Sequence, residues 1–489
     1  MEVLGLCVAL RPSFLQIFQD IKIATADSGY FLTSPPLSNP LSSDPVYQRI
    51  LSAYLPPDIL SQIQPNLNRF AAEAISESVH DLVRNAESQP PFVKTRNVWG
   101  SRPERYRLVT SDGWKQFGKW GLSNGLLAMD MRTSLVRIGG FNYIYSASSA
   151  AYSCPVSMTS GACHLVRFHL DSVPTDHPFH ELYAKLTARE NSWVSAQWMT
   201  ERAGGSDVRN SETVAVYSPL PPKLANLRNV AFILAKTESG QLSLFVAPTV
   251  KTVRGEDGRD KEVTNGIRIH RLKQKFGTKE LPTAELELKG VRAHMVGPKD
   301  RGIATIAMLL NVTRTHNFIT ALSCLRRAIE ISKCFARSRK TLDQPLWTFP
   351  MHLHTLAQLE VKHRGWMHLA FFTTSLLSYD EPEEPEYNVS RLWRDTASNS
   401  VWEGTTNVLA SETVRHLTRG ENPKAFGTWI RDATGNLHDP YKRTLLSACE
   451  ALYAKLDVAM ILGGLATAYN RQTFLPPKAT LMSLLREPR

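Results

Sequence analysis

The pattern of hydrophobic residues changes twice along this chain of 489 residues, and the change limits the folds available to it. Apolar residues recur at helical spacing from about residue 44 to residue 190. Between about 191 and 297, short segments rich in β-branched residues alternate with turn sequences such as ESGQ and RGEDGRD. Long helical patterns return from about residue 302. The sequence therefore predicts a mostly helical α+β protein in which a small β domain separates two helical regions.

The length of the chain exceeds what one hydrophobic core usually supports, so we expect several domains. An acidic, proline-containing stretch, SYDEPEEPEYNVS, interrupts the second helical region. The changes in pattern predict a central small β-barrel or sheet domain over residues 191–297. With the outer boundaries that the family resemblance described below implies, we expect an N-terminal extension over 1–28, an N-terminal helical domain over 29–190, a C-terminal helical bundle over 298–430 and a C-terminal helical extension over 431–489.

A surplus of basic residues limits the partners of the chain. The 57 Lys and Arg residues outnumber the 45 Asp and Glu residues, and a net charge of +12 attracts polyanions such as nucleic acids, nucleotide cofactors and coenzyme A esters. The six cysteines include no C-x-x-C motif, which favours a reducing compartment over a zinc or disulfide framework. No apolar run approaches the ~20 residues of a membrane helix. We expect an intracellular protein, in the cytosol or a peroxisome, with no membrane partner.

The segment MTERAGGSDV, residues 199–208, concentrates small and polar residues. Gly204 and Gly205 permit close approach of the backbone, while Thr200 and Ser206 supply hydroxyls. Exposed backbone N–H groups in such a loop can bind an anion, so the segment suits a phosphate or a flat polar heterocycle. An ordinary surface turn is the alternative reading of the same residues. The tryptophans just upstream, at 193 and 198, are more often core residues than cofactor contacts.

A second segment, WEGTTN at residues 402–407, places a carboxylate beside an aromatic ring. Trp402 would exclude water from Glu403 and raise the pKa of its carboxyl toward that of a useful base. Thr405 and Asn407 follow as hydrogen-bonding groups where a helix is predicted to begin. A lone glutamate at such a place is more often a charge that stabilises the helix amino terminus.

Together the two segments resemble the signatures of the FAD-dependent acyl-CoA dehydrogenase family, and most closely its AidB-like branch. They occur in the family's order, separated by the β segments and a long helical run, and the resemblance spans about residues 29 to 430. It implies the family's fold, an N-terminal helical domain, a central β domain and a C-terminal helical bundle. It also implies FAD as cofactor and the α,β-desaturation of an acyl-CoA thioester, and fungal members suggest a secondary-metabolite or toxin pathway.

The resemblance also assigns roles to individual residues. Glu403 is implied as the catalytic base that removes the α proton, while the β hydride passes to FAD. Its backbone N–H and a ribityl hydroxyl of FAD would hold the thioester oxygen. The implied cofactor-binding residues are Met199, Thr200, Gly205, Ser206, Arg339, Thr341, Thr405 and Asn407, and the implied substrate-binding residues are Asn311, Arg314, Trp402 and Gly404. Arg339 and Thr341 correspond to residues that reach the FAD of a neighbouring subunit, which implies a homo-oligomer, either a dimer or a tetramer.

Three departures from the family pattern affect this cofactor site. A strand pair that normally follows the segment SETVAVYSPL is missing, and Leu342–Asp343 replaces the family's Phe-Gly. The short acidic stretch after residue 377 stands where the family has a helix and a Gly-Gly-x-Gly loop. We expect these changes to weaken contacts with FAD. An Asp is also usual in the family where this chain has Asn311.

Two other functions compete with desaturation. A catalytically impaired AidB-like paralogue could bind nucleic acid or acyl-CoA, and the net charge permits this. However, residues 441–489 spread their Lys and Arg among apolar residues, which favours helix packing, so nucleic acid is not an expected partner. A metal site would have to use His352, His354, His363 and His368, whose spacing does not match H-E-x-x-H, so no metal is expected. The electron acceptor is not indicated by the sequence.

Overall fold

The computed structural model describes residues 37–127, 134–202, 205, 208–219, 229–376 and 422–434, and the single residues 443, 446, 447 and 450. The chain divides into two compact units. The larger unit comprises Asn39–Arg326 and Lys362–Arg489, and the smaller unit comprises Met1–Ser38 and Arg327–Val361.

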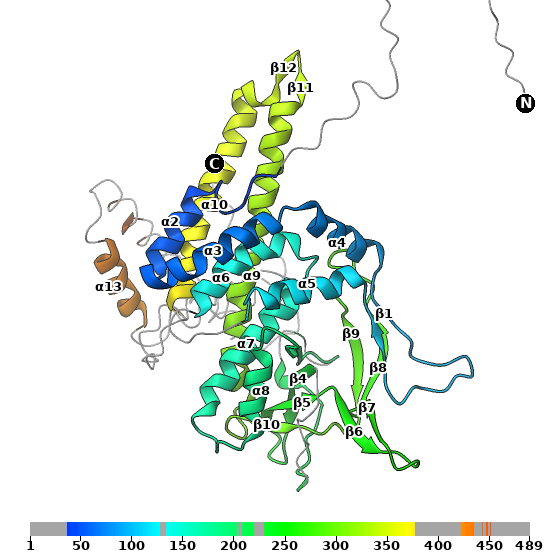
Figure 1. Cartoon of the computed structure of the whole chain (residues 1–489). Coiled ribbons are helices and arrows are strands. Elements are labelled where there is room, and N and C mark those ends of the chain that lie inside the picture. The colour runs from blue at the N-terminus through cyan, green and yellow to red at the C-terminus, as the bar shows by residue number, and fades with distance from the viewer. Residues whose placement is uncertain are drawn as a thin grey trace, which may run out of the picture. The chain divides into compact units, whose positions relative to one another are not determined.

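Helices dominate the first part of the larger unit (Figure 1). Several begin where the sequence supplies a capping side chain or a proline. Asp44 Oδ1 accepts hydrogen bonds from the N–H groups of Val46 and Tyr47, and Ser111 caps its helix through Trp114. The helices are α2 (Pro45–Tyr54), α3 (Pro57–Glu73), α4 (Glu77–Ser88), α5 (Asp112–Ser123), α6 (Ser134–Tyr145), α7 (Ser153–Leu170) and α8 (Pro178–Leu186), with the 3-10 helix η1 (Ser146–Ser148) after α6.

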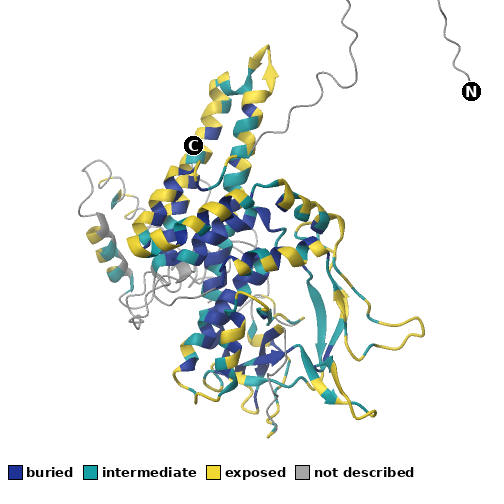
Figure 2. Ribbon diagram, in the orientation of Figure 1, coloured by how far each residue is buried: buried dark blue, intermediate teal, exposed yellow. Residues whose placement is uncertain are grey.

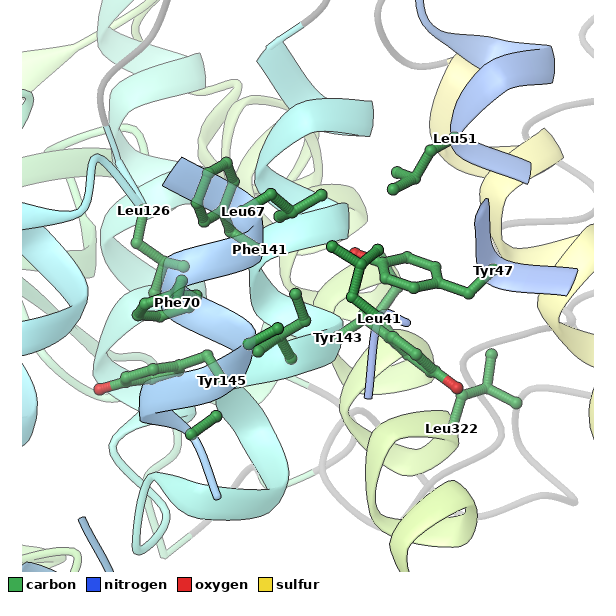
Figure 3. Close-up of a cluster of buried hydrophobic side chains, with 14 of the residues drawn as sticks. Leu41, Tyr47, Leu51, Leu67, Phe70, Leu126, Phe141, Tyr143, Tyr145 and Leu322 are labelled. Carbon is green, nitrogen blue, oxygen red and sulfur yellow. The ribbon is translucent and has the colours of Figure 1, made fainter. Parts of the chain in front are cut away.

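Aromatic residues form the centre of the hydrophobic core in this region (Figure 3). Phe70 of α3 packs 5.6 Å from Phe141 of α6, measured between ring centroids, and Tyr47 of α2 packs 4.7 Å from Tyr143. All four rings are buried, and Leu322 of a later helix joins them. Residues far apart in the sequence therefore share this core, so the N-terminal helices and the later helix stabilise one another.

A four-stranded sheet follows the helices. Its strands are β3 (Val194–Trp198), β4 (Asn229–Lys236), β5 (Leu242–Pro248) and β10 (His294–Val296), in the order β10-β5-β4-β3. Strand β3 runs parallel to β4, whereas β4–β5 and β5–β10 are antiparallel. The sequence VAFILA of β4 is buried at every residue because both faces of this strand are covered, as Figure 2 shows for this part of the chain.

The remaining strands form antiparallel pairs. They are β1 (Phe92–Val93) with β2 (Leu108–Val109), β6 (Val250–Arg254) with β7 (Asp260–Thr264), and β8 (Ile267–Leu272) with β9 (Ala284–Leu288). Gly258 has a φ of 72° in the turn between β6 and β7, a conformation that glycine adopts without strain. The β6–β7 and β8–β9 pairs lie with the four-stranded sheet inside the range predicted for the central β domain, residues 191–297, whereas the β1–β2 pair lies in the range predicted to be helical.

Two long helices, α9 (Gly302–Ser338) and α10 (Pro350–Leu376), each contribute residues to both units. In the smaller unit the chain between them forms β11 (Lys340–Thr341), β12 (Gln344–Pro345) and η3 (Leu346–Thr348). Lys333 pairs with Glu360 at 2.6 Å, and the Arg337 guanidinium lies 4.8 Å from the centre of the Trp347 ring. A further helix, α13 (Asn422–Thr434), belongs to the larger unit.

The order of helices, sheet and helices confirms the predicted α+β fold class. The boundaries predicted for the five segments stay predictions, and most of the extension over 431–489 lies outside the described residues. Within the described part of the chain, no helix is both long enough and apolar enough to span a membrane.

His316 on α9 makes stability depend on pH. Its side chain is 3 % exposed, and burial lowers the pKa of the imidazole to about 4, below its ordinary 6.5. Between these two values the unfolded chain binds a proton that the folded chain does not bind, so lowering the pH destabilises the fold. The free energy of unfolding is therefore fully present above pH 6.5 and should fall by about 3 kcal/mol toward pH 4 from this group.

We expect the substitution His316→Leu to flatten this dependence in urea titrations between pH 7.5 and pH 5. The exposed His368 provides the control, because His368→Gln should leave the pH profile of the wild type unchanged. A His316→Leu profile as steep as that of the wild type would contradict this prediction.

Candidate functional site

Strand β3 positions the segment predicted to bind the flavin. Its five residues pair in parallel with β4, and the strand ends at Trp198, immediately before Met199 and Thr200. Met199 is half-buried against the core beneath the sheet, whereas Thr200 is exposed. Gly205 is also exposed, and no atom lies within 4 Å of the position that a Cβ would occupy there. Of the implied cofactor contacts, Met199 and Thr200 are therefore brought together at the carboxyl end of β3.

The carboxylate of Glu201 joins the two ends of this segment. It accepts hydrogen bonds from the backbone N–H of Glu212 at 2.5 Å and of Thr213 at 3.2 Å. Thr213 and Ala215 are in turn bonded to the backbone of Lys236 in β4, both at 2.8 Å. Partial burial tends to raise the pKa of Glu201, but the bonds from Thr213 and Glu212 and the charge of Lys236 hold it below its ordinary value. The anionic form of Glu201 thus fixes both ends of the segment that contains Gly205.

Gln197 has a buried donor that the described protein does not satisfy. Its Nε2 has no hydrogen-bond partner among the described residues, and it lies two positions before Met199 on β3. The neighbouring indoles belong to the core, since Trp198 packs with Ile233 and Leu288 and Trp193 is 3 % exposed. An unsatisfied donor beside an open glycine-containing segment fits the carbonyl and nitrogen acceptors along the edge of a flavin ring.

Asn311 and Arg314 lie one turn apart on α9. Arg314 Nη1 donates to Asn311 Oδ1 at 3.5 Å, and both side chains are half-buried. The structure thus brings together the two residues that were predicted to bind the coenzyme A moiety.

Arg339 and Thr341 lie in the smaller unit, after the end of α9. Both are exposed, and Thr341 pairs with Gln344 across the β11–β12 hairpin. The turn of this hairpin consists of Leu342 and Asp343, whose φ values of 49° and 60° are left-handed. Leu342 is 84 % exposed. A bulky residue such as Leu342 is strained in this conformation, which glycine would adopt without strain.

The other implied site residues lie outside the described residues, and their roles stay predictions. They are Ser206, Trp402, Glu403, Gly404, Thr405 and Asn407. Among the residues that are described, no group of three or more His, Cys, Asp or Glu side chains could hold a metal ion.

Neither Glu201 nor Gln197 was among the predicted site residues. Glu201 belongs to the quoted motif, but its bonds to residues eleven and twelve positions later depend on the course of the backbone. Gln197 carries no signal in the sequence, because an unsatisfied donor becomes visible only when its burial is known.

Known proteins resemble this chain over most of its length. Residues 300–389 match the family described as acyl-CoA dehydrogenase, C-terminal domain. The acyl-CoA dehydrogenase family member 11 of Caenorhabditis elegans is 29 % identical over 477 residues, which cover 83 % of this chain and 75 % of that protein. The crystal structure of Caenorhabditis elegans ACDH-11 in complex with C11-CoA superposes with a TM-score of 0.76 at 28 % identity, covering 95 % of this chain and 86 % of that one. The chain is therefore similar to acyl-CoA dehydrogenases over most of its length, and residues 300–389 match the C-terminal domain of that family.

Members of this family are FAD-dependent oxidoreductases that act on CH–CH groups, so the predicted enzyme class and the predicted cofactor are confirmed. The putative acyl-CoA dehydrogenase AidB of Escherichia coli is also similar, at 23 % identity over 56 % of this chain and 59 % of that protein. The described residues at the end of β3 fit the cofactor of the acyl-CoA dehydrogenases, because they combine an accessible backbone with an unsatisfied donor.

The Glu201 bonds predict how FAD affinity responds to substitution. Replacing Glu201 with alanine removes the acceptor of two backbone N–H groups, so the ends of the segment separate and FAD should bind about ten- to a hundredfold more weakly. Glu201→Gln keeps one acceptor oxygen and should give an intermediate loss. Fluorescence titration of the apoprotein with FAD measures both values.

The exposed Glu256, in the turn between β6 and β7, provides the control, since Glu256→Ala should bind FAD as the wild type does. Equal FAD affinity of Glu201→Ala and Glu256→Ala would contradict the role given to Glu201.

Proposed function

We propose that this chain introduces an α,β double bond into an acyl-CoA thioester, with Glu403 as the base. The observation that carries this proposal is the open segment at the carboxyl end of β3, held by Glu201, within a chain that matches acyl-CoA dehydrogenases over most of its length. The resemblance of WEGTTN to the family's base-carrying motif supports the assignment of Glu403.

In the proposed mechanism, described residues hold the cofactor and the substrate, and Glu403 transfers the proton. Met199 and Thr200 would hold the edge of the flavin, and the absence of a side chain at Gly205 would let the cofactor approach the backbone. Arg314 holds a negatively charged part of coenzyme A, and Asn311 orients its guanidinium. Glu403 then takes the α proton of the thioester, and the backbone N–H of Glu403 donates to the thioester oxygen as negative charge develops there.

FAD, when bound, supplies the acceptor for the hydride that leaves the β carbon. The C–H bonds at the α and β carbons break and a carbon–carbon double bond forms between these atoms.

The proposal extends to the substrate class, the assembly and the location of the enzyme. A relative crystallised in complex with C11-CoA supports an extended acyl group, and a branched or polyketide-like acyl group from a fungal secondary-metabolite pathway is the narrower proposal. Exposed apolar side chains in the smaller unit, including Leu342 at 84 % and Met351 at 86 %, support a homo-oligomeric assembly, a dimer or a tetramer. We place the enzyme in the cytosol or a peroxisome.

Product analysis tests the proposed reaction. Purified protein loaded with FAD is incubated with C11-CoA and an artificial electron acceptor, and the thioester is followed by mass spectrometry. We expect a product that lacks two hydrogens and carries an α,β double bond. Protein that binds both FAD and C11-CoA and never forms this product would contradict the proposal and favour a paralogue with a binding role only.

A further inference from the structure

A groove of about 1160 Å³ lies in the larger unit among α3, α4, α5 and the residues that precede β3. Val194, the first residue of β3, lines it, whereas the flavin segment begins after the last residue of that strand. Five residues of extended strand span about 16 Å, so the groove and the proposed flavin site lie at opposite ends of β3. The proposed reaction leaves this groove without a function.

Tyr152 lines the groove with a side chain that is 9 % exposed. Its ring packs 4.5 Å from that of Trp114, and its hydroxyl has no hydrogen-bond partner among the described residues. A Cβ at Gly118 would lie 2.4 Å from this hydroxyl oxygen, so glycine leaves the space that the hydroxyl occupies. Burial raises the pKa of Tyr152 to about 12, which keeps the hydroxyl protonated and available as a donor at neutral pH.

The charged residues of the groove are predominantly basic. Four of them are cations and two, Glu73 and Glu190, are carboxylates. Glu73 already accepts a hydrogen bond from Trp120 Nε1 at 2.7 Å. Lys119 and Arg189 make no hydrogen bond or ion pair with any residue that the structure describes. These two cations can therefore bind an anion without first breaking a contact within the protein.

The amino terminus of α4 also opens on the groove. Ser76 caps this helix of 12 residues and Ser78 follows in its first turn, with the two hydroxyl oxygens 3.0 Å apart. The first N–H groups of a helix have no partner within the helix and carry a partial positive charge. The groove therefore combines a helix amino terminus, two cations and the hydroxyl of Tyr152.

We propose that this groove binds a phosphate monoester, a small molecule distinct from the acyl-CoA substrate. A carboxylate has two oxygens, which is too few for this number of donors, whereas a phosphate monoester has three terminal oxygens and close to two negative charges. Arg189 and Lys119 neutralise the charge, and Tyr152 and the first turn of α4 donate to the oxygens. The volume of the groove accommodates the organic part of the ester as well.

Isothermal titration of the FAD-loaded protein with inorganic phosphate, and separately with acetate, tests the proposal. We expect saturable binding of phosphate that exceeds binding of acetate, a loss of at least tenfold in affinity for Arg189→Gln and for Lys119→Gln, and about threefold for Tyr152→Phe. Lys279→Gln, at an exposed lysine outside the groove, should bind phosphate as the wild type does. Tyr152→Phe keeps the buried ring, so a weaker affinity for phosphate in this variant reports the missing hydroxyl and not a damaged fold.

Two outcomes would overturn the proposal. The first is phosphate binding that is absent, or equal in Arg189→Gln, Lys119→Gln and Lys279→Gln. The second is a rise in the KM for acyl-CoA in Arg189→Gln, because the phosphate held there would then belong to coenzyme A. A failure to desaturate acyl-CoA would leave phosphate binding unaffected, so the two proposals fail separately.

Discussion

Replacing Glu403 with glutamine is expected to leave the visible spectrum of the bound flavin unchanged and to abolish its reduction by an acyl-CoA thioester. Glutamine keeps the size of the side chain and its hydrogen bonding but cannot accept the α proton. Loss of a positioned general base typically slows a reaction by about 10²- to 10⁴-fold. Stopped-flow absorbance under anaerobic conditions, with C11-CoA as the reductant, measures the rate.

Glu256→Gln is the matched control for this experiment, since Glu256 is exposed in the β6–β7 turn and has no part in the proposed site. It should reduce at the wild-type rate. Rapid reduction of the Glu403→Gln variant would show that another group removes the proton.

Replacing Asp44 with asparagine is expected to lower the free energy of unfolding by about 3 to 5 kcal/mol, because it breaks a buried ion pair. Asp44 Oδ2 lies 3.2 Å from Arg326 Nε and 3.3 Å from the Tyr143 hydroxyl, and Asp44 is 6 % exposed. The burial of Tyr143 and the charge of Asp44 raise the pKa of that tyrosine, so its hydroxyl remains a donor. Asparagine can still cap α2 through its Oδ1, so the measured loss of stability reports the missing charge and not a missing helix cap.

Equilibrium unfolding in urea measures the loss. Asp58→Asn, at an exposed aspartate in the first turn of α3, should cost well under about 1 kcal/mol. The double variant Asp44→Asn with Arg326→Met removes both charges and should recover part of the stability. A loss for Asp44→Asn no larger than that for Asp58→Asn would contradict the importance of this pair, which connects α2, α6 and α9.

Local chemistry explains how much of the fold could be predicted. The capping aspartate at 44 and the proline that follows it mark the start of α2 in the sequence itself. The start of α8 is less evident, because His177 Nδ1 accepts from the N–H of Phe179 and histidine is not among the usual capping residues. The parallel pairing of β3 with β4 depends on the path of the intervening chain, so its register could not be derived from either strand alone.

Only those residues of the candidate site that belong to a sequence motif of the family could be predicted. The family motif indicated Met199 and Thr200, and the structure places both at the end of β3. The bonds from Glu201 to Glu212 and Thr213 are tertiary contacts, which no spacing rule encodes. The left-handed turn at Leu342 could not be predicted either, because turns of this kind usually contain glycine or asparagine and this one contains neither.

Whether this chain binds FAD and passes electrons to it from an acyl-CoA can be measured in the visible spectrum of the purified protein. We expect flavin absorbance in the visible range, from cofactor retained through purification or added afterwards, and anaerobic bleaching of that absorbance by C11-CoA. Folded protein that takes up no FAD, or protein that takes up FAD and keeps an unchanged spectrum with every acyl-CoA offered, would show that the chain is not an acyl-CoA dehydrogenase.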